Sequence, residues 1–192
     1  ADEVGDRALS RAAVFLDRDG TVNVDTGFVR RRGDVSLVPG AASAIARLNA
    51  AGVPVVVVTN QSGIGRGLLS LAEFERVQSR IADLLAAQGA RMDAAYHCPH
   101  DPTNGACDCR KPGTALFRRA AAELGLALER SWYVGDRWRD VAPSLELGGE
   151  GILVPGAGTP EEDLQLARER LRLLPTLGDV VDAVLASLAT AR

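Results

Sequence analysis

Two aspartates separated by one residue, Asp17 and Asp19, directly follow a short apolar run that ends at Leu16. Such a run predicts a buried β-strand, and ligands bind at the carboxyl ends of the strands of an open α/β sheet. Paired carboxylates there repel each other and lose hydration unless a cation or a phosphate-transfer reaction uses them. Gly20 and Thr21 allow a tight turn whose backbone N–H groups can face an anion. An isolated pair of this kind would indicate a strand end capped by acids in an Asx turn.

Three further motifs favour the chemical interpretation, because a parallel sheet would present them at the same edge. In chain order they are Thr59-Asn60-Gln61-Ser62-Gly63 after the apolar residues 53–58, Arg110-Lys111-Pro112-Gly113 before a helical stretch, and Gly135-Asp136 with Asp140 after the apolar residues 132–134. Hydroxyl and cationic groups stabilise the oxygens of a transferring phosphoryl group, and carboxylates bind a hard cation such as Mg²⁺. The four motifs together therefore complete one site, where a cation or a phosphate group can bind.

The order of these motifs resembles the haloacid dehalogenase superfamily of phosphotransferases, over about residues 12 to 154. The resemblance implies that Asp17 is the nucleophile, which forms an aspartyl-phosphate, and that Asp19 is the general acid and base. It implies that Thr59 and Lys111 hold the transferring phosphoryl oxygens. The implied ligands of a Mg²⁺ ion are the side chains of Asp17 and Asp136 and the backbone carbonyl of Asp19, with Asp140 beside them.

All three cysteines and both histidines of the chain lie within residues 97–109, which predicts a metal site. Cys-x-His and Cys-x-Cys pairs can supply four tetrahedral zinc ligands, namely Cys98, His100, Cys107 and Cys109. An odd number of cysteines argues against a disulfide framework, so the alternative is a chance cluster of buried thiols. His97 is the rival ligand, but on an extended backbone it points away from Cys98. Because four protein ligands leave no position for water, we expect structural zinc in a loop over residues 98–109.

A zinc loop in a short chain of this superfamily resembles the heptose bisphosphate phosphatases and their close relatives, the histidinol-phosphate phosphatases. The resemblance implies removal of the 7-phosphate of D-glycero-D-manno-heptose 1,7-bisphosphate, in the biosynthesis of nucleotide-activated heptose. Histidinol phosphate or another small sugar phosphate is the alternative substrate. The residues that the resemblance places at the substrate are Asp25, Thr26, Gly27, Phe28, Asn60, Gln61, Ser62 and Arg110.

Charge and composition argue against several other classes of protein. The net charge is −3, which argues against a protein that coats nucleic acid. We interpret Arg30, Arg31 and Arg32 as a solvated surface run, and Arg66 as part of a Gly-rich turn. No run approaches the roughly 18 apolar residues of a membrane span, and residues 1–11 lack the features of a secretory signal, so we expect a cytoplasmic protein. A zinc-loop binding module is the non-enzyme alternative, but such a module would not need carboxylates and a lysine at strand ends.

Length and the alternation of elements predict one α/β domain over residues 1–192, with enough hydrophobic residues, 46%, for a sizeable core. The strands are predicted over 12–16, 53–59, 94–97, 132–135 and 151–154, and the helices over 41–51, 70–88, 114–124, 141–147, from 160 onward and over 177–189. Ser70 and Glu73 predict a capping box. This alternation implies a Rossmann-like three-layer sandwich around a parallel sheet. Because only about twenty residues separate Thr21 from Gly40, we expect a capless or minimally capped monomer.

Overall fold

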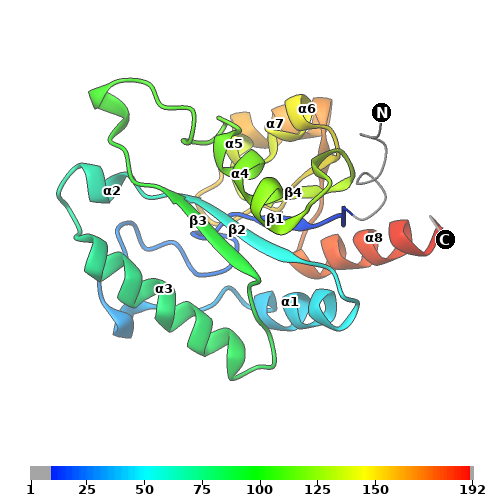
Figure 1. Cartoon of the computed structure of the whole chain (residues 1–192), viewed down its shortest axis with the longest axis horizontal. Helices are drawn as coiled ribbons and strands as arrows, with labels where there is room; N and C mark the ends of the chain where they lie inside the picture. Colours follow the sequence, from blue (N-terminus) through cyan, green and yellow to red (C-terminus); the bar gives the residue numbers. More distant parts are fainter. Residues whose placement is uncertain (1–9, 191–192) are drawn as a thin grey trace, which may run out of the picture.

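In the described part of the chain, residues 10–190, six parallel strands form one sheet in the order β3-β2-β1-β4-β5-β6 (Figure 1). In this computed structural model they are β1 (Val14–Leu16), β2 (Val55–Asn60), β3 (Ala94–Cys98), β4 (Trp132–Gly135), β5 (Glu150–Leu153) and β6 (Arg172–Leu173). Every neighbouring pair is parallel, so the predicted sheet is confirmed. The short strand β6 is absent from the sequence-based prediction, because two residues carry no readable periodicity.

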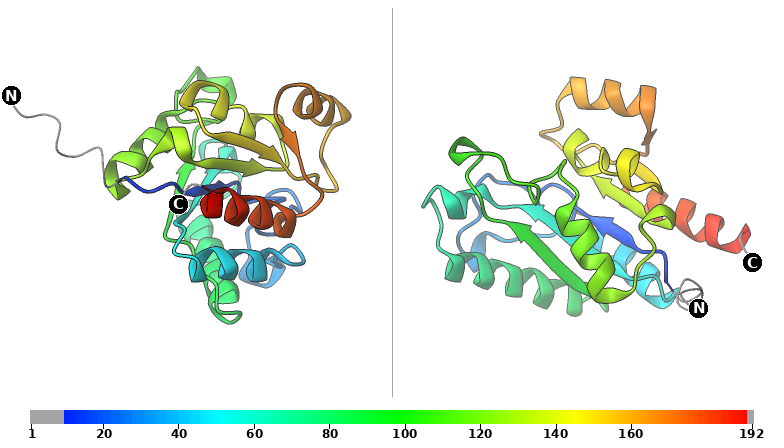
Figure 2. Two further views of the ribbon diagram at one scale, coloured as in Figure 1. Left: turned by 90° about the vertical axis from the view of Figure 1, so that its right-hand side faces the viewer. Right: turned by 45° about the horizontal axis from the view of Figure 1, so that its top comes forward.

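Helices cover both faces of this sheet (Figure 2). They are α1 (Ala41–Ala50), α2 (Ser62–Gly65), α3 (Leu71–Ala86), α4 (Ala115–Leu124), α5 (Trp138–Val141), α6 (Ser144–Leu147), α7 (Glu161–Arg170) and α8 (Leu177–Thr190), with short 3-10 turns η1 (Arg32–Asp34), η2 (Pro102–Asn104) and η3 (Leu128–Arg130). One face packs against α1, α3 and α8, and the other against α4 and α6, while α5 and α7 pack on β5. The predicted Rossmann-like three-layer sandwich is confirmed.

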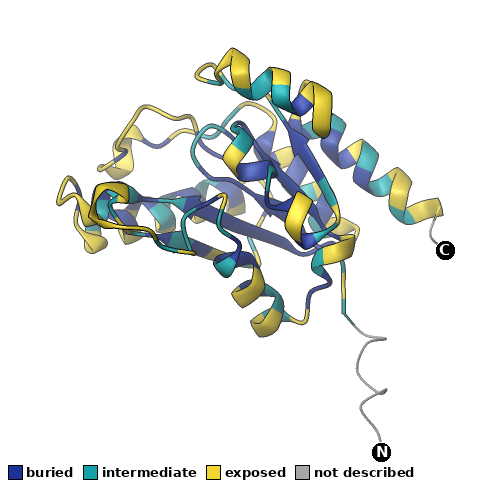
Figure 3. Cartoon of the chain, turned by 90° about the horizontal axis from the view of Figure 1, so that it is seen from above, coloured by how far each residue is buried: buried dark blue, intermediate teal, exposed yellow. Residues whose placement is uncertain are grey.

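Alternation along β1 divides its side chains between the two faces of the sheet. Val14 and Leu16 join the core beneath α1, α3 and α8, whereas Phe15 faces the opposite side. There the Phe15 ring centroid lies 5.3 Å from those of Phe117 and Tyr133. The central strands are almost entirely buried, while exposed residues lie on the outer helix surfaces and loops (Figure 3). This packing fixes the carboxyl end of β1, immediately after which Asp17 lies.

Local sequence signals set several helix ends. At α3 the Ser70 hydroxyl accepts a hydrogen bond from the Glu73 N–H (3.1 Å), and the Glu73 carboxylate accepts one from the Ser70 N–H (2.7 Å), which confirms the capping box. Gly125 ends α4 at a φ of 64°, as predicted. The single helix predicted over 141–147 is wrong, because Pro143 has no N–H to continue a helix and instead precedes the separate helix α6.

Residues 17–40, between β1 and α1, form an irregular segment that contains η1 rather than a cap domain. The Val38 N–H donates to the Val22 carbonyl at 2.9 Å, which ties the end of this segment back to its beginning. The expected capless arrangement is confirmed. Within residues 10–190 no helix has the length and apolar character needed to cross a bilayer. The expectation of no secretory signal in residues 1–11 falls mainly on residues 1–9, which lie outside the described part.

Candidate active site

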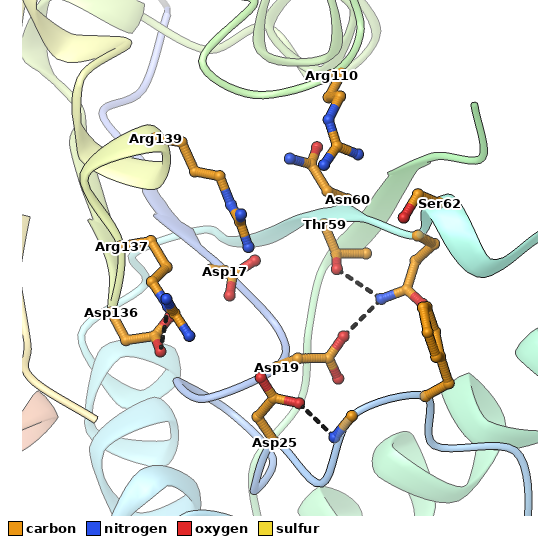
Figure 4. Close-up of a pocket in the computed structure, with 13 residues that line it drawn as sticks. Asp17, Asp19, Asp25, Thr59, Asn60, Ser62, Arg110, Asp136, Arg137 and Arg139 are labelled. Carbon is orange, nitrogen blue, oxygen red and sulfur yellow. Dashed lines mark hydrogen bonds and ion pairs between the residues drawn. The ribbon is translucent and has the colours of Figure 1, made fainter. Parts of the chain in front are cut away.

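The carboxyl ends of β1, β2 and β4 meet at a pocket of about 250 Å³ (Figure 4). β1 lies at the point where the strand order reverses, with β2 on one side and β4 on the other, and such switch points are where open α/β sheets bind ligands. The lining residues are Asp17, Asp19, Asp25, Gly27, Phe28, Thr59, Asn60, Gln61, Ser62, Arg110, Asp136, Arg137 and Arg139. The structure thus brings together most of the predicted site. Three residues that the resemblance places in the site, Thr26, Lys111 and Asp140, are not among the lining residues. Lys111 and Asp140 are buried and reach the site through their contacts with each other and with Asp17.

Three carboxylates crowd together at the base of this pocket. Oxygen atoms of Asp17, Asp136 and Asp140 lie within 4.8 Å of one another, so one divalent cation could contact them together. Burial and the nearby charge of Asp140 raise the pKa of Asp17 to about 7 and that of Asp136 to about 6. One oxygen of Asp136, Oδ1, is buried and has no hydrogen-bond partner within residues 10–190. The donor set and this unpartnered oxygen fit a hard cation such as Mg²⁺.

Lys111 is the cationic partner of this acidic cluster. Its ammonium group donates to Asp17 Oδ1 and to the Val58 carbonyl, both at 2.6 Å, and lies 2.8 Å from Asp140 Oδ1. Burial lowers the pKa of Lys111, but the charges of Asp140 and Asp17 outweigh it, so the net pKa is raised and the lysine stays charged. Asn60 positions this lysine, because its side-chain amide accepts from the Lys111 N–H (2.9 Å) and donates to the Lys111 carbonyl (3.2 Å).

The Asp19 carboxylate is held apart from the other acids by three side-chain donors. Arg18 donates to both of its oxygens, Asn23 Nδ2 donates to Oδ1 at 3.0 Å, and Gln61 Nε2 donates to Oδ2 at 2.6 Å. Gln61 Nε2 also lies 2.9 Å from the Thr59 hydroxyl oxygen, which accepts its hydrogen bond. A predicted substrate contact, Gln61, therefore also links the expected general acid to the expected phosphate-binding threonine.

Two arginines of the pocket, Arg137 and Arg139, were not identified from the sequence. Arg137 Nε lies 3.5 Å from Asp136 Oδ2, and the Arg139 side chain is directed toward Asp17 (Figure 4). The available signal was the presence of two cations between the acids of the Gly135–Asp140 motif. Their direction depends on the extended backbone at Arg137 and on the start of α5, which spacing alone does not predict.

The arginines that the sequence assigns to a surface run and to a Gly-rich turn lie away from the pocket. Arg66 Nε is 3.4 Å from Asp101 Oδ1, and Arg66 does not line the pocket, which agrees with its interpretation as a turn residue. Arg30 and Arg32 are exposed and pair with acidic residues of α3, at 3.5 Å and 3.0 Å. The interpretation of residues 30–32 as a solvated surface run is consistent with this placement.

The predicted zinc ligands converge at the end of β3. The Sγ atoms of Cys98 and Cys109 are 3.1 Å apart, each lies 3.6 Å from Cys107 Sγ, and His100 Nδ1 is 3.1 Å from Cys109 Sγ. Ligand atoms around tetrahedral zinc, with bonds of about 2.3 Å, are separated by about 3.7 Å, so the cluster can hold zinc. The rival ligand His97 packs instead on Phe74, with 4.3 Å between ring centroids.

Gly65 explains how this loop approaches the end of the second strand so closely. The Gly65 N–H donates to the Pro99 carbonyl at 2.8 Å. A Cβ atom at this position would lie 2.6 Å from both the Pro99 oxygen and the Asp101 nitrogen, closer than van der Waals contact permits. The Gly-rich turn after β2 therefore supports the zinc loop, whose last residues lead into Arg110 and Lys111.

Comparisons with known proteins agree with this geometry. A HAD-hydrolase-like family model matches residues 108–180, and a polynucleotide kinase 3 phosphatase model matches residues 15–142. The chain is 38% identical over 165 residues to D-glycero-beta-D-manno-heptose-1,7-bisphosphate 7-phosphatase of Pseudomonas aeruginosa, covering 81% of this chain and 92% of that relative. It is 37% identical over 154 residues to the enzyme of that name from Escherichia coli K12, covering 77% of this chain and 81% of that relative.

Solved structures give the same result. The D,D-heptose 1,7-bisphosphate phosphatase of B. bronchiseptica, complexed with magnesium and phosphate, superposes with a TM-score of 0.82. It is 35% identical in sequence, and the alignment covers 92% of this chain and 99% of that one. The chain is therefore a phosphatase of the haloacid-dehalogenase-like type and belongs to the family of the D-glycero-beta-D-manno-heptose-1,7-bisphosphate 7-phosphatases.

Proposed function

We propose that this chain hydrolyses the 7-phosphate of D-glycero-D-manno-heptose 1,7-bisphosphate through an aspartyl-phosphate on Asp17. The observation that carries the proposal is the arrangement at the end of β1. There the carboxylates of Asp17, Asp19 and Asp136 face a pocket large enough for a small phosphate ester, and the buried Lys111 ammonium group lies 2.6 Å from Asp17 Oδ1. The family relationship supplies the substrate, since the relatives described above carry the name of this activity.

In the first step an oxygen of Asp17 attacks phosphorus, the new Asp17 O–P bond forms, and the bond from phosphorus to the sugar oxygen breaks. Lys111 and the Thr59 hydroxyl hold the phosphoryl oxygens as negative charge redistributes over them. The side chains of Asp17 and Asp136 and the carbonyl of Asp19 would hold Mg²⁺, which supplies positive charge against the combined charge of carboxylate and phosphate. Asp140 keeps Lys111 in place through their contact of 2.8 Å.

Asp19 handles the proton in both steps. In the first step it donates a proton to the leaving sugar oxygen, whose alkoxide is a poor leaving group. In the second step it removes a proton from the water that attacks phosphorus, and the Asp17 O–P bond breaks to release inorganic phosphate. Placement of the Asp19 carboxylate on the pocket wall, next to Gln61 and Thr59, supports this assignment.

The arginines of the pocket suit the second phosphate of a bisphosphate. Arg110, Arg137 and Arg139 line the pocket in addition to the cation that serves the reacting phosphate, Lys111. Arg110 Nη1 is buried without a hydrogen-bond partner among the described residues, so it has a donor to offer. A planar guanidinium can give a phosphate two parallel hydrogen bonds. We assign the sugar to the loop formed by Asp25, Gly27 and Phe28 and to the side chains after β2.

The zinc cluster has a structural role in this proposal, because it fixes the loop that delivers Arg110 and Lys111 to the pocket. Thiolate zinc ligands suit a reducing compartment, which supports a cytoplasmic location. We further propose that residues 1–192 act as a single catalytic domain and as a monomer, on a small phosphorylated sugar rather than on nucleic acid or a membrane. Within this proposal the reaction belongs to the biosynthesis of nucleotide-activated heptose.

The decisive experiment compares phosphate release from heptose 1,7-bisphosphate and from histidinol phosphate by the same preparation with Mg²⁺. We expect kcat/KM to be at least about 100-fold higher for the bisphosphate, since one well-placed phosphate–arginine pairing is worth about 3 kcal/mol. Product analysis should show loss of the 7-phosphate only. Equal or greater activity on histidinol phosphate would assign the enzyme to the related phosphatases, and no activity on the bisphosphate would refute the proposal.

A further inference from the structure

The side chain between the two catalytic aspartates, Arg18, is a buried cation that does not line the pocket. It is 2% exposed, and its guanidinium reaches the carboxylate of its neighbour Asp19 through three short contacts. Nε and Nη2 lie 3.1 Å and 2.9 Å from Oδ1, and Nη2 lies 3.0 Å from Oδ2. A planar guanidinium that engages both oxygens fixes the plane of the carboxylate as well as its position.

The Arg18 guanidinium lies over an aromatic ring that is itself part of an aromatic pair. The Arg18 Cζ lies 5.3 Å from the centroid of the Phe74 ring, and the other ring of the pair, His97, lies 4.3 Å from Phe74. Nη1 of the guanidinium is buried without a partner in the described part of the chain. Burying a guanidinium is costly unless a carboxylate compensates its charge, and Asp19 is the carboxylate that does so.

Two further donors complete the cradle around Asp19 and come from different segments. Asn23 belongs to the turn after β1 and donates to Oδ1 at 3.0 Å, while Gln61 follows β2 and donates to Oδ2 at 2.6 Å. Asn23 is also fixed through its backbone, because its N–H donates to the Arg18 carbonyl at 3.1 Å. Arg18 thus contributes twice to this geometry, through its side chain and through the turn that it closes.

We propose that Arg18 is a positioning residue for proton transfer, which holds the Asp19 carboxylate where it can reach the leaving oxygen of the substrate. The inference rests on the proposed function of Asp19 and adds the group through which the fold controls it. A general acid acts only within hydrogen-bond reach of the oxygen that it protonates, and a displacement of about 1 Å can cost about 100-fold in rate. A rigid fork is therefore required at residue 18 rather than a positive charge alone.

Lysine at this position separates the two requirements. Arg18→Lys keeps a positive charge but loses the planar fork, so Asp19 keeps a cationic neighbour and loses its fixed orientation. We expect KM to change little, because Arg18 does not line the pocket, whereas the rate of the first chemical step falls. The matched control is Arg119→Lys, since Arg119 also pairs with a carboxylate (Glu123, 2.7 Å) and lies over an aromatic ring (Tyr96, 5.5 Å), but outside the pocket.

The experiment measures the first step in single turnovers, with enzyme in excess, for wild type, Arg18→Lys, Asp19→Asn and the double variant. The leaving group of heptose bisphosphate is a sugar alkoxide, which needs a proton, whereas that of p-nitrophenyl phosphate is p-nitrophenolate, which does not. We expect Arg18→Lys to slow the step about 10- to 100-fold with the bisphosphate and less than about threefold with p-nitrophenyl phosphate. In the Asp19→Asn background it should cause no further slowing.

The outcomes distinguish this inference from the proposed function. The inference is wrong, and Arg18 has only a structural role, if Arg18→Lys lowers the rate of the first step equally with both substrates. The same conclusion follows if Arg18→Lys lowers the rate of the Asp19→Asn enzyme by the same factor as that of wild type. If Asp19→Asn alone affects both substrates equally, the proposed role of Asp19 fails, and the inference fails with it. Should Arg18→Lys not fold, Asp19→Asn is compared with Asp19→Asn/Arg18→Met, which buries no charge at either position. A further loss of rate in that pair would also overturn the inference.

Discussion

Replacing Asp17, the proposed nucleophile, should make this enzyme inactive and at the same time more stable. Asp17→Asn keeps the shape of the side chain but removes the attacking carboxylate, so we expect turnover to be abolished. The stability gain follows from the surroundings of Asp17, which is 9% exposed and lies beside the carboxylate of Asp140. The pKa of Asp17 is raised from 3.8 to about 7, mainly because the group is buried and secondly because the charge of Asp140 is close.

The sign and size of the effect follow from proton linkage. Below pH 3.8 Asp17 is protonated in both the folded and the unfolded chain and costs no stability. Between 3.8 and about 7 the unfolded chain loses this proton while the folded chain keeps it, so wild-type stability falls as the pH rises. At about 1.4 kcal/mol per pKa unit, the largest loss above this window is about 4 kcal/mol. Asparagine cannot ionise, so the variant avoids this loss.

The stability difference between wild type and Asp17→Asn is measured by thermal melts from pH 4 to 8. The buffer contains no magnesium and no chelator that would remove zinc. Even a gain of 1 kcal/mol raises the Tm of a domain of this size by about 2–4 °C, so the variant should melt clearly higher at pH 7.5. At pH 4 the two proteins should melt together. Added Mg²⁺ should raise the Tm of wild type more than that of the variant, because ion binding to the native state relieves the crowded carboxylates.

Glu73→Gln provides a control of opposite sign. The hydrogen bond from the Ser70 backbone is the main cause that lowers the pKa of Glu73, so this carboxylate stabilises the fold above its unfolded pKa of 4.5. Its replacement should lower the Tm at pH 7.5, and the difference should shrink as the pH falls. The prediction is refuted if Asp17→Asn has a lower Tm than wild type at pH 7.5, or if its gain in Tm is the same at pH 4 and pH 7.5. Either result would show that the ionised Asp17 carboxylate does not destabilise the fold.

Three further predictions concern the proton donor, the zinc loop and the arginines. Asp19→Asn should slow sugar phosphate hydrolysis far more than the release of p-nitrophenolate in the first turnover, and equal losses would exclude Asp19 as the general acid. Zinc should copurify at about one per chain and resist mild chelation, whereas Mg²⁺ should be lost readily and restore activity on addition. Cys107→Ser should lower the Tm, and it should raise KM more than it disturbs Mg²⁺ affinity. Active protein that contains no zinc would contradict the structural zinc site. Arg110→Ala should raise KM for the bisphosphate about tenfold or more with little change for p-nitrophenyl phosphate, and an unchanged KM would remove Arg110 from the substrate site.

The charged groups that the fold brings together after β1 and β4 can be located in the sequence, because each is of a type that is rarely buried without a function. Asp17 and Asp136 stand at the ends of apolar runs, where burial is costly for a charged group, and Lys111 directly precedes a predicted helix. The strand pattern then places them at one edge of a parallel sheet, and the structure puts their side chains in contact or close to it. The zinc ligands were predictable for a similar reason, since all the cysteines and histidines of the chain gather within one short segment.

Arg137 and Arg139 lie in the same pocket but were not predictable in this way. Arginine is common on protein surfaces, so its presence in a loop says little about where it points. The extended backbone at Arg137 and the helical start at residue 138 decide which side chain faces the pocket. The boundary between α5 and α6 is likewise not predictable from the spacing, because the apolar pattern continues across Pro143 while the hydrogen-bonding pattern does not.

The groups that orient a reactive side chain are harder to recognise in a sequence than the reactive side chain itself. Gln61 and Asn23 are ordinary polar residues of turns, and Arg18 carries no special spacing beyond its place between two aspartates. Their importance comes from contacts with a single carboxylate, made from segments that are up to 42 residues apart in the chain. Such contacts exist only once the sheet has brought the ends of β1 and β2 together, with Val14 opposite Val55 in register. Strand register therefore helps to fix the position of the Asp19 carboxylate, because Asp19 follows one strand and Gln61, a donor that holds it, follows the next.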